Sequence, residues 1–473
     1  EGAGLLGYRI ASIERKDGED NVATLTFTHV VHGTRVSVEA PCGAQPLVPL
    51  DALPAHLGDV QLSPRVMAML STMLQLHALG RDVCVVPASL AGDAVHAQAS
   101  TSKSVCIGVF GALLGYPVET LWLYKDVSGN ELVMRRGTSP DGATVWHPAP
   151  LTLGAVDGTL VHLAGADVLG PTLESLARLT QDRELELWEG TRLTLAPPGT
   201  RGRLTSGTVC PMARNVRIVA SAPSAAQWLS ESVATMFATL AAPPMDEGEE
   251  RDVLEKRTGL SRARADQLLA FAQRYRRESA DPNVGLHKAR RLGTRQLLRF
   301  ANRLAHFPET DVYALVWRNQ LADFLPRTVR DVLKTMLLEA GLVPHGYEGA
   351  AQYIPPVAVA PPTVDAAQRT LTFRAAEGER TLLTVPQYDW RTHDPDGASL
   401  IPDARGSFFH NAQQSRLLYS LMQDLVVLKE HLLLMGAQGT GKNKIIDQAL
   451  ELLDRPREYI QMNRDSTVGE LLQ

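Results

Sequence analysis

Eight residues near the end of the chain have the types and spacing of a phosphate-binding loop. They read Gly-Ala-Gln-Gly-Thr-Gly-Lys-Asn at positions 436–443 and follow the apolar run 432–435. Glycines permit the tight turn that points backbone amides at phosphate oxygens, Lys442 can reach the outer phosphates, and the amino terminus of a following helix favours an anion. The spacing predicts a strand, a nucleotide-binding loop and a helix, and the alternative is a glycine-rich turn with a surface lysine. The predicted nucleotide-binding residues are Gly436, Gln438, Gly439, Thr440, Gly441, Lys442 and Asn443.

Asn443 departs from the usual pattern of such loops. The last position is normally Ser or Thr, whose hydroxyl ligates magnesium, and Asn443 offers a weaker carbonyl oxygen there instead. We expect phosphate binding to persist while the geometry around the metal changes. The predicted cofactors are therefore ATP and Mg²⁺, with Asn443 as the residue at the metal.

The segment after this loop repeats a segment far upstream. The string that begins at Arg455 shares with the string that begins at Tyr116 a proline, a glutamate, a base–Asp pair and a Glu–Leu pair. Each shared residue of the later string lies 339 positions after its equivalent in the earlier one, as the two prolines show (456 − 117 = 339). The same offset applied to Lys442 gives 442 − 339 = 103, and position 103 is a lysine followed by Ser104. Lys103 and Ser104 are therefore predicted to be a second, weaker nucleotide site.

The loop of the first copy is eroded. Ser100 and Ser102 stand where the second copy has glycine, and serine adopts the required backbone angles poorly. The apolar strand predicted at 83–86 also lies about sixteen residues before Lys103, farther than a compact phosphate loop needs. The pattern indicates a degenerate loop with an insertion, and the alternative is that Lys103 is an ordinary loop lysine.

A predicted β-hairpin precedes each copy. Residues 24–38 and 370–383 both alternate in polarity around a glycine-containing turn, and each hairpin ends at a proline. An amphipathic helix is then expected at 67–79 and again at 412–429. Repetition on this scale indicates tandem domains, since solenoid repeats run only about 20 to 50 residues.

Composition limits the possible functions. A chain of 473 residues with 44% hydrophobic residues has room for two to four domains, and its net charge of −5 favours no particular partner. The arginine-rich stretch 251–299 is punctuated by acids at helical spacing and is interpreted as a solvated helix face, so nucleic-acid binding is not expected. The four cysteines are scattered and are expected to be buried in a reducing, soluble compartment. No membrane-spanning run is present in the sequence. A chain that begins at Glu1 without methionine and ends in the middle of a motif is expected to be a fragment.

The residues between the repeats have the order of one complete module. Strands are expected at 158–163, 184–190 and 216–220, with a helix at 171–179 and two later helices at 263–277 and 294–307. Strands that alternate with helices, followed by helices alone, predict a parallel α/β domain with a helical lid.

These features together resemble the AAA+ ATPases of the dynein-related (midasin and MoxR-like) branch, and more closely the von Willebrand factor A domain-containing protein 8 family. The strings that carry the resemblance are GAQGTGKNKIIDQ, RPREYIQMNRDST, LWLYKDVSGNELVMRR, TQDRELELWEGTRL and LGTRQLLRFANRL. The resemblance spans essentially the whole chain and implies a mitochondrial location. It also implies that residues 81–345 are the second module of a longer chain and that 411–473 open the third.

The resemblance implies an α/β fold. We expect an AAA+ P-loop NTPase module with a parallel sheet and a helical lid, flanked by small β-hairpin segments, plus the start of a second module. The expected parts are a hairpin and linker at 1–60, a degenerate α/β core at 61–245, a helical lid at 246–345, a second hairpin and linker at 346–410, and the start of the next core, with its Walker A loop, at 411–473.

Comparison with the catalytic positions of the family predicts weak ATP hydrolysis by the first complete module. The resemblance places the acidic Walker B pair at 164–165, which are Ala and Gly, the first sensor near 221–222, and the arginine finger at Met236. A thioether cannot stabilise developing phosphate charge, and loss of such a finger can cost about three to five powers of ten in rate. Arg295 matches the second sensor, and the alternative is a surface arginine of the lid.

Two function classes follow. The first is an ATPase that binds ATP at 436–443 and couples hydrolysis to conformational change, with a non-hydrolysing first module and its catalytic acids beyond Gln473. The second is a nucleotide-binding or structural ring segment without hydrolysis of its own. A small-molecule P-loop kinase is a third possibility that leaves the repeat unexplained. The expected partners are ATP and neighbouring AAA+ modules of the same chain or ring, and no protein client is indicated.

Overall fold

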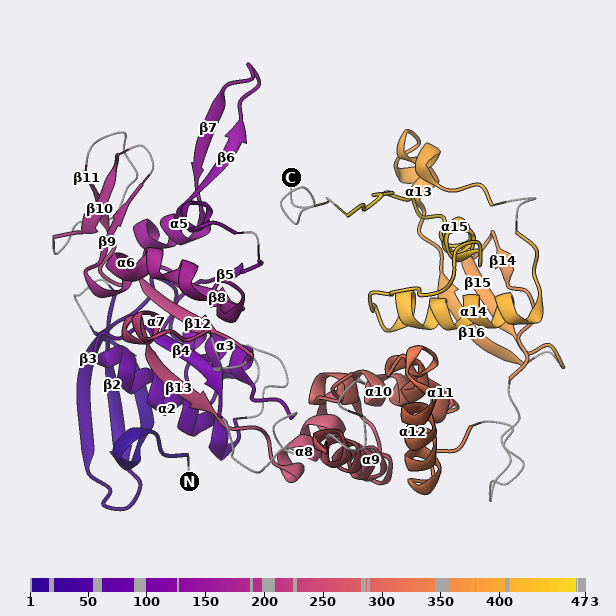
Figure 1. The fold of residues 1–473 in the computed structure, drawn as a ribbon, viewed down its shortest axis with the longest axis horizontal. Coiled ribbons are helices and arrows are strands. Elements are labelled where there is room, and N and C mark those ends of the chain that lie inside the picture. The colour runs from indigo at the N-terminus through magenta and orange to yellow at the C-terminus, as the bar shows by residue number, and fades with distance from the viewer. Residues whose placement is uncertain are drawn as a thin grey trace. The chain divides into compact units, whose positions relative to one another are not determined.

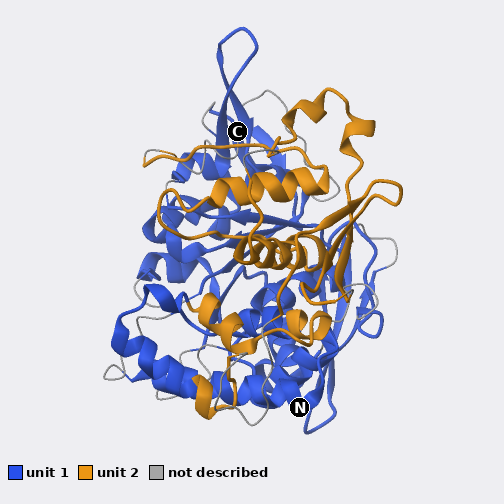
Figure 2. Ribbon diagram, turned by 90° about the vertical axis from the view of Figure 1, so that its right-hand side faces the viewer, with its two compact units in different colours: residues 1–301, 321–336, 467–473 blue, residues 302–320, 337–466 orange. Residues whose placement is uncertain are grey.

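The computed structural model divides into two compact units (Figure 2). Unit 1 contains residues 1–301, 321–336 and 467–473, and unit 2 contains 302–320 and 337–466. The structure describes residues 2–16, 21–53, 62–88, 99–125, 127–187, 190–197, 209–223, 228–281, 286, 290–344, 357–378, 380–404, 408–464 and 466. Four parts of the predicted repeat, residues 97–98, 126, 465 and 467–471, lie outside the described residues.

A parallel five-stranded sheet forms the centre of unit 1 (Figure 1). Its strand order is β13-β4-β12-β8-β5. The strands are β4 (Val83–Pro87), β5 (Val118–Trp122), β8 (Leu160–Ala164), β12 (Arg217–Ser221) and β13 (Ala238–Ala242). Every residue of β8 and β12 is buried, as expected for strands covered on both faces. The predicted parallel sheet is confirmed.

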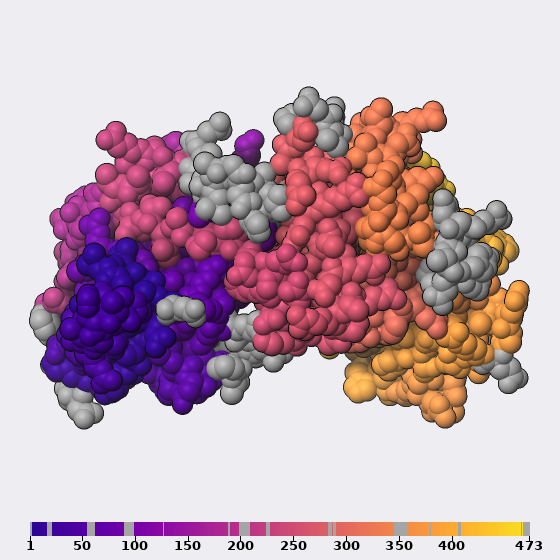
Figure 3. All heavy atoms as spheres, turned by 90° about the horizontal axis from the view of Figure 1, so that it is seen from below, coloured from indigo at the N-terminus to yellow at the C-terminus, as the bar shows by residue number. Residues whose placement is uncertain are grey.

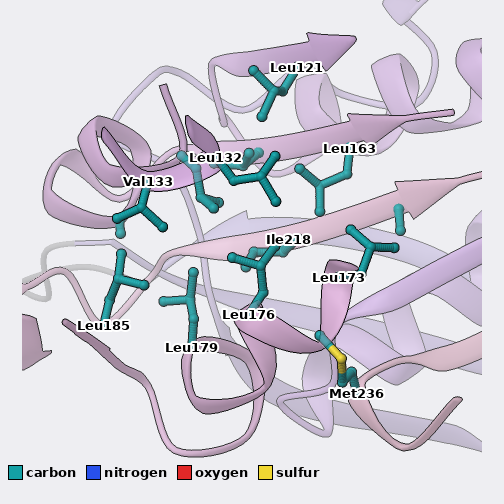
Figure 4. Packing of buried hydrophobic residues seen from close by; sticks show 14 of the residues in the cluster. Leu121, Leu132, Val133, Leu163, Leu173, Leu176, Leu179, Leu185, Ile218 and Met236 are labelled. Carbon is teal, nitrogen blue, oxygen red and sulfur yellow. The ribbon is translucent and has the colours of Figure 1, made fainter. Parts of the chain in front are cut away.

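Alternate residues of the strands face two separate cores. On β4, Val83 and Val85 join a cluster with the helices α2 (Pro64–Ala78) and α3 (Lys103–Leu113). Cys84 joins the cluster on the opposite face, because successive strand residues point to opposite sides of a sheet. Figure 4 shows this second cluster, in which strand residues such as Leu163 and Ile218 meet side chains of the covering helices.

Short helices cover the second face. The single helix predicted at 171–179 is instead a 3₁₀ segment followed by a short α-helix, and Gly170 before Pro171 adopts a φ of 48°. The elements of this layer are α4 (Gly129–Val133), α5 (Pro150–Asp157), η3 (Ala166–Val168), η4 (Gly170–Leu176), α6 (Ala177–Gln181) and α7 (Glu231–Met236).

Small β-structures accompany the core of unit 1. A hairpin projects from it in Figure 1 and interrupts the α4–α5 region. These structures are the β6–β7 hairpin (Met134–Thr138, Thr144–Pro148) and the sheet of β9 (Glu184–Glu186), β10 (Arg192–Leu195) and β11 (Val209–Met212).

The predicted amino-terminal hairpin is part of a three-stranded antiparallel sheet. Its strands are β1 (Tyr8–Arg15), β2 (Val22–His29) and β3 (Arg35–Pro41), preceded by η1 (Leu5–Gly7). β1 was not predicted because its residues mix charged and apolar types without a clean alternation. The sheet packs on α2 through Ile10, Leu25 and Phe27. In the space-filling view its residues, in indigo, form one continuous patch (Figure 3).

In the described part of the chain, five α-helices follow the sheet domain. They are α8 (Glu247–Thr258), α9 (Arg262–Ala280), α10 (Thr294–His306), α11 (Val312–Asn319) and α12 (Arg327–Glu339), with η6 (Ala322–Phe324) between the last two. The helices predicted at 263–277 and 294–307 are confirmed. The solvated face predicted for the arginine-rich stretch is wrong at Arg276, whose side chain is only 2% exposed because it pairs with Glu250.

Unit 2, like the start of unit 1, contains a three-stranded antiparallel sheet followed by helices. A three-stranded antiparallel sheet packs on two helices through Leu371, Phe373, Leu418 and Ile445, among other residues. The elements are β14 (Thr363–Asp365), β15 (Thr370–Arg374), β16 (Thr381–Pro386), α13 (Trp390–His393), η7 (Gly397–Leu400), α14 (Ala412–Met422), the π-helical η8 (Gln423–Val427) and α15 (Lys442–Leu453).

The strand predicted at 432–435 is not formed, and Leu433 is 84% exposed. Its counterpart in unit 1, β4, pairs with β12 and β13. No strand of the described residues pairs with residues 432–435.

All four cysteines are free and buried. Among the described helices, none combines the length and the apolar character that crossing a lipid bilayer demands. The part of the chain that the structure describes also holds no group of three or more His, Cys, Asp or Glu residues arranged to bind a metal.

Candidate functional site

The loop at 436–443 is a compact turn at the start of α15. Gly439 and Gly441 adopt φ angles of 82° and 80°, in the left-handed region that glycine occupies without strain. A Cβ atom at either position would meet nothing within 4 Å. The glycines are therefore required by the backbone angles, and the space beside them is open to a ligand.

The lysine of this loop folds back over it. Lys442 Nζ donates to the carbonyl oxygens of Gly436 at 2.8 Å and Ala437 at 2.7 Å, and Thr440 Oγ1 donates to Ala437 O at 2.9 Å. Neutral carbonyls are weaker partners for an ammonium group than phosphate oxygens are. The arrangement fits a phosphate group that replaces these carbonyls.

Asn443 lies on the first turn of α15 and is exposed. Its amide oxygen could contribute one ligand to Mg²⁺, which normally keeps several waters and also binds the phosphates of the nucleotide. Gln438 is exposed on the turn itself. The residues of this loop are therefore well suited to bind a phosphate group. They offer a metal ion one side-chain ligand, the amide oxygen of Asn443.

The equivalent loop of unit 1 starts a helix at the equivalent lysine. α3 begins at Lys103, and the residue before it, Ser102, has φ 56° and ψ 22°. Gly441 before α15 has φ 80° and ψ 18°, and 441 − 339 = 102. Ser102 thus keeps the left-handed conformation that a side chain disfavours. The surroundings of Ser102 must compensate for this strain.

Arg65 of α2 supplies much of that compensation. Its Nη2 donates to Ser102 Oγ at 3.0 Å, and its Nη1 donates to Thr101 O at 3.0 Å and to Pro243 O at 2.9 Å. Two 2.8 Å hydrogen bonds join the same guanidinium to Glu249. The first loop is therefore held from one side by a largely buried arginine, which sequence analysis missed because it comes from a distant helix.

Lys103 is directed to the carboxyl end of β12, the central strand of the sheet. Its Nζ donates to Ala222 O at 2.6 Å, and Ala222 is one of the two residues predicted at the first sensor. Burial lowers the pKa of Lys103, and the negative charge of Asp167 opposes this shift. Within the described residues, the buried Oδ1 of Asp167 has no hydrogen-bond partner.

Asp167 is a second residue that sequence analysis missed. β8 ends at Ala164, and Gly165 adopts a φ of 83° before η3 brings Asp167 toward Lys103. The signal was an acid two residues after the predicted Ala-Gly pair, displaced from the usual position. Ser221, at the other half of the predicted sensor position, has its Oγ 2.8 Å from His162 Nε2.

The first loop is also joined to the helical lid of unit 1. The Ser100 amide donates to Thr294 Oγ1 at 2.8 Å, and this hydroxyl donates to Glu250 Oε1 at 2.5 Å. Glu250 forms two 2.8 Å hydrogen bonds with Arg276, whose Nε donates to Leu292 O at 2.8 Å. The chain itself therefore makes polar connections between loop and lid.

The remaining predicted site residues lie apart. Met236 is only 4% exposed and belongs to the core shown in Figure 4. Ser104 and Arg295 are both exposed, and in the described part of the chain no hydrogen bond joins them to Lys103. The structure thus brings Lys103, Ala222 and Asp167 together and leaves Ser104 and Arg295 outside this group.

Sequence comparison agrees with the geometry of the second loop. The AAA domain (dynein-related subfamily) matches residues 431–473. The von Willebrand factor A domain-containing protein 8 of Mus musculus is 31% identical over 488 residues, an alignment that covers 99% of this chain and 24% of that protein. The chain therefore contains part of an AAA domain of the dynein-related subfamily, at residues 431–473. It spans about a quarter of the length of the mouse relative.

Two solved structures also align with parts of this chain. A putative ATPase from Cytophaga hutchinsonii aligns with a TM-score of 0.25 and 10% identity, over 48% of this chain and 54% of that chain. A mutant of RuvB from Thermotoga maritima aligns with a TM-score of 0.30 and 9% identity, over 62% of this chain and 87% of that chain.

Proposed function

We propose that this chain is a segment of an AAA+ ATPase that binds ATP and Mg²⁺ at loop 436–443. The observation that carries the proposal is the state of that loop. Gly439 and Gly441 supply left-handed turns with open space beside them, and Lys442 donates to carbonyl oxygens that a phosphate group could replace. The residues proposed to contact the nucleotide are Gly436, Gln438, Gly439, Thr440, Gly441, Lys442 and Asn443.

The proposal assigns the first loop a structural role. Arg65 and Thr294 occupy hydrogen-bonding groups of residues 100–102, and Lys103 is engaged by Ala222 O. No acid stands at 164–165, and Met236 offers no charge to a transition state. We therefore propose that this module does not hydrolyse ATP and that contacts within the chain replace the bridge that a nucleotide would make between core and lid.

Tandem organisation is part of the same proposal. The order of sheet, helix, loop and helix recurs in both units, and the helices after the two loops begin at lysines 339 positions apart. We propose the domain limits 1–60, 61–245, 246–345, 346–410 and 411–473 on this basis. Hydrolysis would then shift a lid against its core, with neighbouring modules as partners, and the mitochondrial location implied by the family resemblance stays a prediction.

A nucleotide-binding scaffold without hydrolysis is the second candidate. The geometry of loop 436–443 favours nucleotide binding. It does not identify the acidic residues that would activate water for hydrolysis. Both candidates require ATP at the same loop. They differ only in whether the longer protein hydrolyses the ATP that it binds.

Nucleotide binding tests the proposal directly. We would titrate a fluorescent ATP analogue with Mg²⁺ into the chain and into Lys442→Ala, Lys103→Ala and Lys444→Ala. Loss of charge-assisted contacts to phosphate is expected to weaken binding about 100-fold or more in Lys442→Ala. Lys444, a lysine of the same helix turn, is the control and should have no effect. Equal loss in Lys103→Ala would contradict the structural role of the first loop.

A further inference from the structure

Unit 2 contains a cavity that lies apart from the phosphate-binding loop, since none of residues 436–443 lines it. It has a volume of about 620 Å³ and is bounded by the end of α10, by α11, by the start of β16 and by α14. Its lining carries more positive than negative side chains. The positive or titratable ones are Arg303, Arg318, Arg380, Arg416 and His306, and the acidic ones are Glu309 and Asp311.

Two of the four arginines are already neutralised. Arg303 is 5% exposed, and its guanidinium contacts Asp424, donates to Gln423 Oε1 at 2.6 Å and to Ser420 Oγ at 3.3 Å. Arg380 forms an ion pair with Glu309. These pairs fix one wall of the cavity and leave little charge on it.

The other two arginines have no such partner. Arg318 Nη1 donates to the neutral Ser420 Oγ at 3.2 Å, and among the described residues no carboxylate forms an ion pair with Arg318 or Arg416. Burial and the nearby positive charges of Arg303 and Arg416 lower the pKa of Arg318, while Asp424 opposes the shift. Like charges held close together in a partly dehydrated site repel, and a bound anion would relieve this repulsion.

The rest of the lining is suited to an organic molecule. Apolar side chains from several elements share the cavity with the hydroxyls of Thr310, Tyr419 and Ser420. The apolar ones include Phe307, Leu315, Val359, Leu382 and Leu417. Ligand cavities commonly have volumes of about 300 to 1,000 Å³ and combine apolar walls with a few polar groups.

We propose that this cavity binds a small organic phosphate, with its phosphate group at Arg318 and Arg416 and its apolar body against Leu315 and Leu417. Planar guanidinium groups bind phosphate through paired hydrogen bonds and are preferred to lysine for this purpose. Donors from two different helices suit a tetrahedral group with several acceptor oxygens. The site is independent of the ATP site proposed at loop 436–443.

Calorimetric titration with phenyl phosphate tests the inference. The whole chain should bind this probe saturably and bind benzoate, a carboxylate of similar size, more weakly. Arg416→Gln and Arg318→Gln should each weaken binding of phenyl phosphate about 10-fold or more. Arg374→Gln, an exposed arginine of β15 outside the cavity, and Lys442→Ala should leave it unchanged.

Three results would overturn the inference. They are the absence of saturable binding, equal affinity in Arg416→Gln and the unaltered chain, and loss of binding in Lys442→Ala, which would place the probe at the ATP loop. Because Arg416 is exposed, its substitution is not expected to disturb folding. Circular dichroism of Arg318→Gln would show whether the second variant is folded, and Arg416→Gln decides the question alone if it is not.

Discussion

The buried pair between Glu250 and Arg276 should be the most sensitive point of the connection between the first loop and its lid. The two side chains are 3% and 2% exposed and share two hydrogen bonds of 2.8 Å. Replacing Arg276 with Met removes one charge and leaves the Glu250 carboxylate buried, with the Thr294 hydroxyl as its remaining donor among the described residues. Breaking such a pair costs about 3 to 5 kcal/mol.

Thermal unfolding of the chain measures this loss. For a unit of this size, 3 to 5 kcal/mol corresponds to a decrease in Tm of about 4 to 7 °C in the transition that involves unit 1. Arg274→Met is the matched control. Arg274 lies in the same helix, and its side chain is 41% exposed where it pairs with Glu278, so less than about 1 kcal/mol is expected.

A double variant separates the charge from the packing. Replacing Glu250 and Arg276 together with Met removes both charges and should recover most of the lost stability, because two apolar side chains of similar volume leave no unpaired ion. The reasoning fails if Arg276→Met is as stable as Arg274→Met. It also fails if the double variant is no more stable than Arg276→Met.

Two further predictions concern titration and the loop backbone. Burial lowers the pKa of His77 to about 3 and of His162 to about 4. Both histidines are neutral in the folded chain and take up protons more readily in the unfolded chain. Their contribution to the free energy of unfolding should therefore be fully present above about pH 6.5 and decrease as the pH falls toward 4. Thermal unfolding between pH 7 and 4 checks this, and His162→Gln should reduce the slope. Gly441→Ala should destabilise by about 1 kcal/mol through its φ of 80° without a clash, as denaturant unfolding would show. Gly108→Ala is the control, because Gly108 lies inside α3 where a Cβ would also meet nothing within 4 Å, and this variant should be more stable by about 0.5 to 1 kcal/mol.

Three strands of the central sheet, β4, β8 and β12, and the helices after the sheet could be predicted from sequence because their signal is local, whereas β5 and β13 were not predicted. β8 and β12 are apolar at nearly every position, and α10 repeats its apolar residues at helical spacing. β14 was not predicted, because all three of its residues are exposed and carry no pattern. The strand at 432–435 was predicted from an apolar run that has no pairing partner among the described strands.

The candidate sites divide in the same way. The loop at 436–443 could be identified from spacing alone, since its glycine angles are a local property. Arg65 and Asp167 could not be identified, because one is brought to Ser102 by the packing of α2 and the other to Lys103 by the turn after β8. Their roles depend on tertiary contacts between residues far apart in the sequence.

The number of ATP molecules bound per chain tests the central claim most directly. Equilibrium dialysis with labelled ATP and Mg²⁺ should give one molecule per chain, lost in Lys442→Ala and retained in Lys103→Ala. Two molecules per chain, one of them lost in Lys103→Ala, would show that the first loop binds nucleotide and would contradict the account.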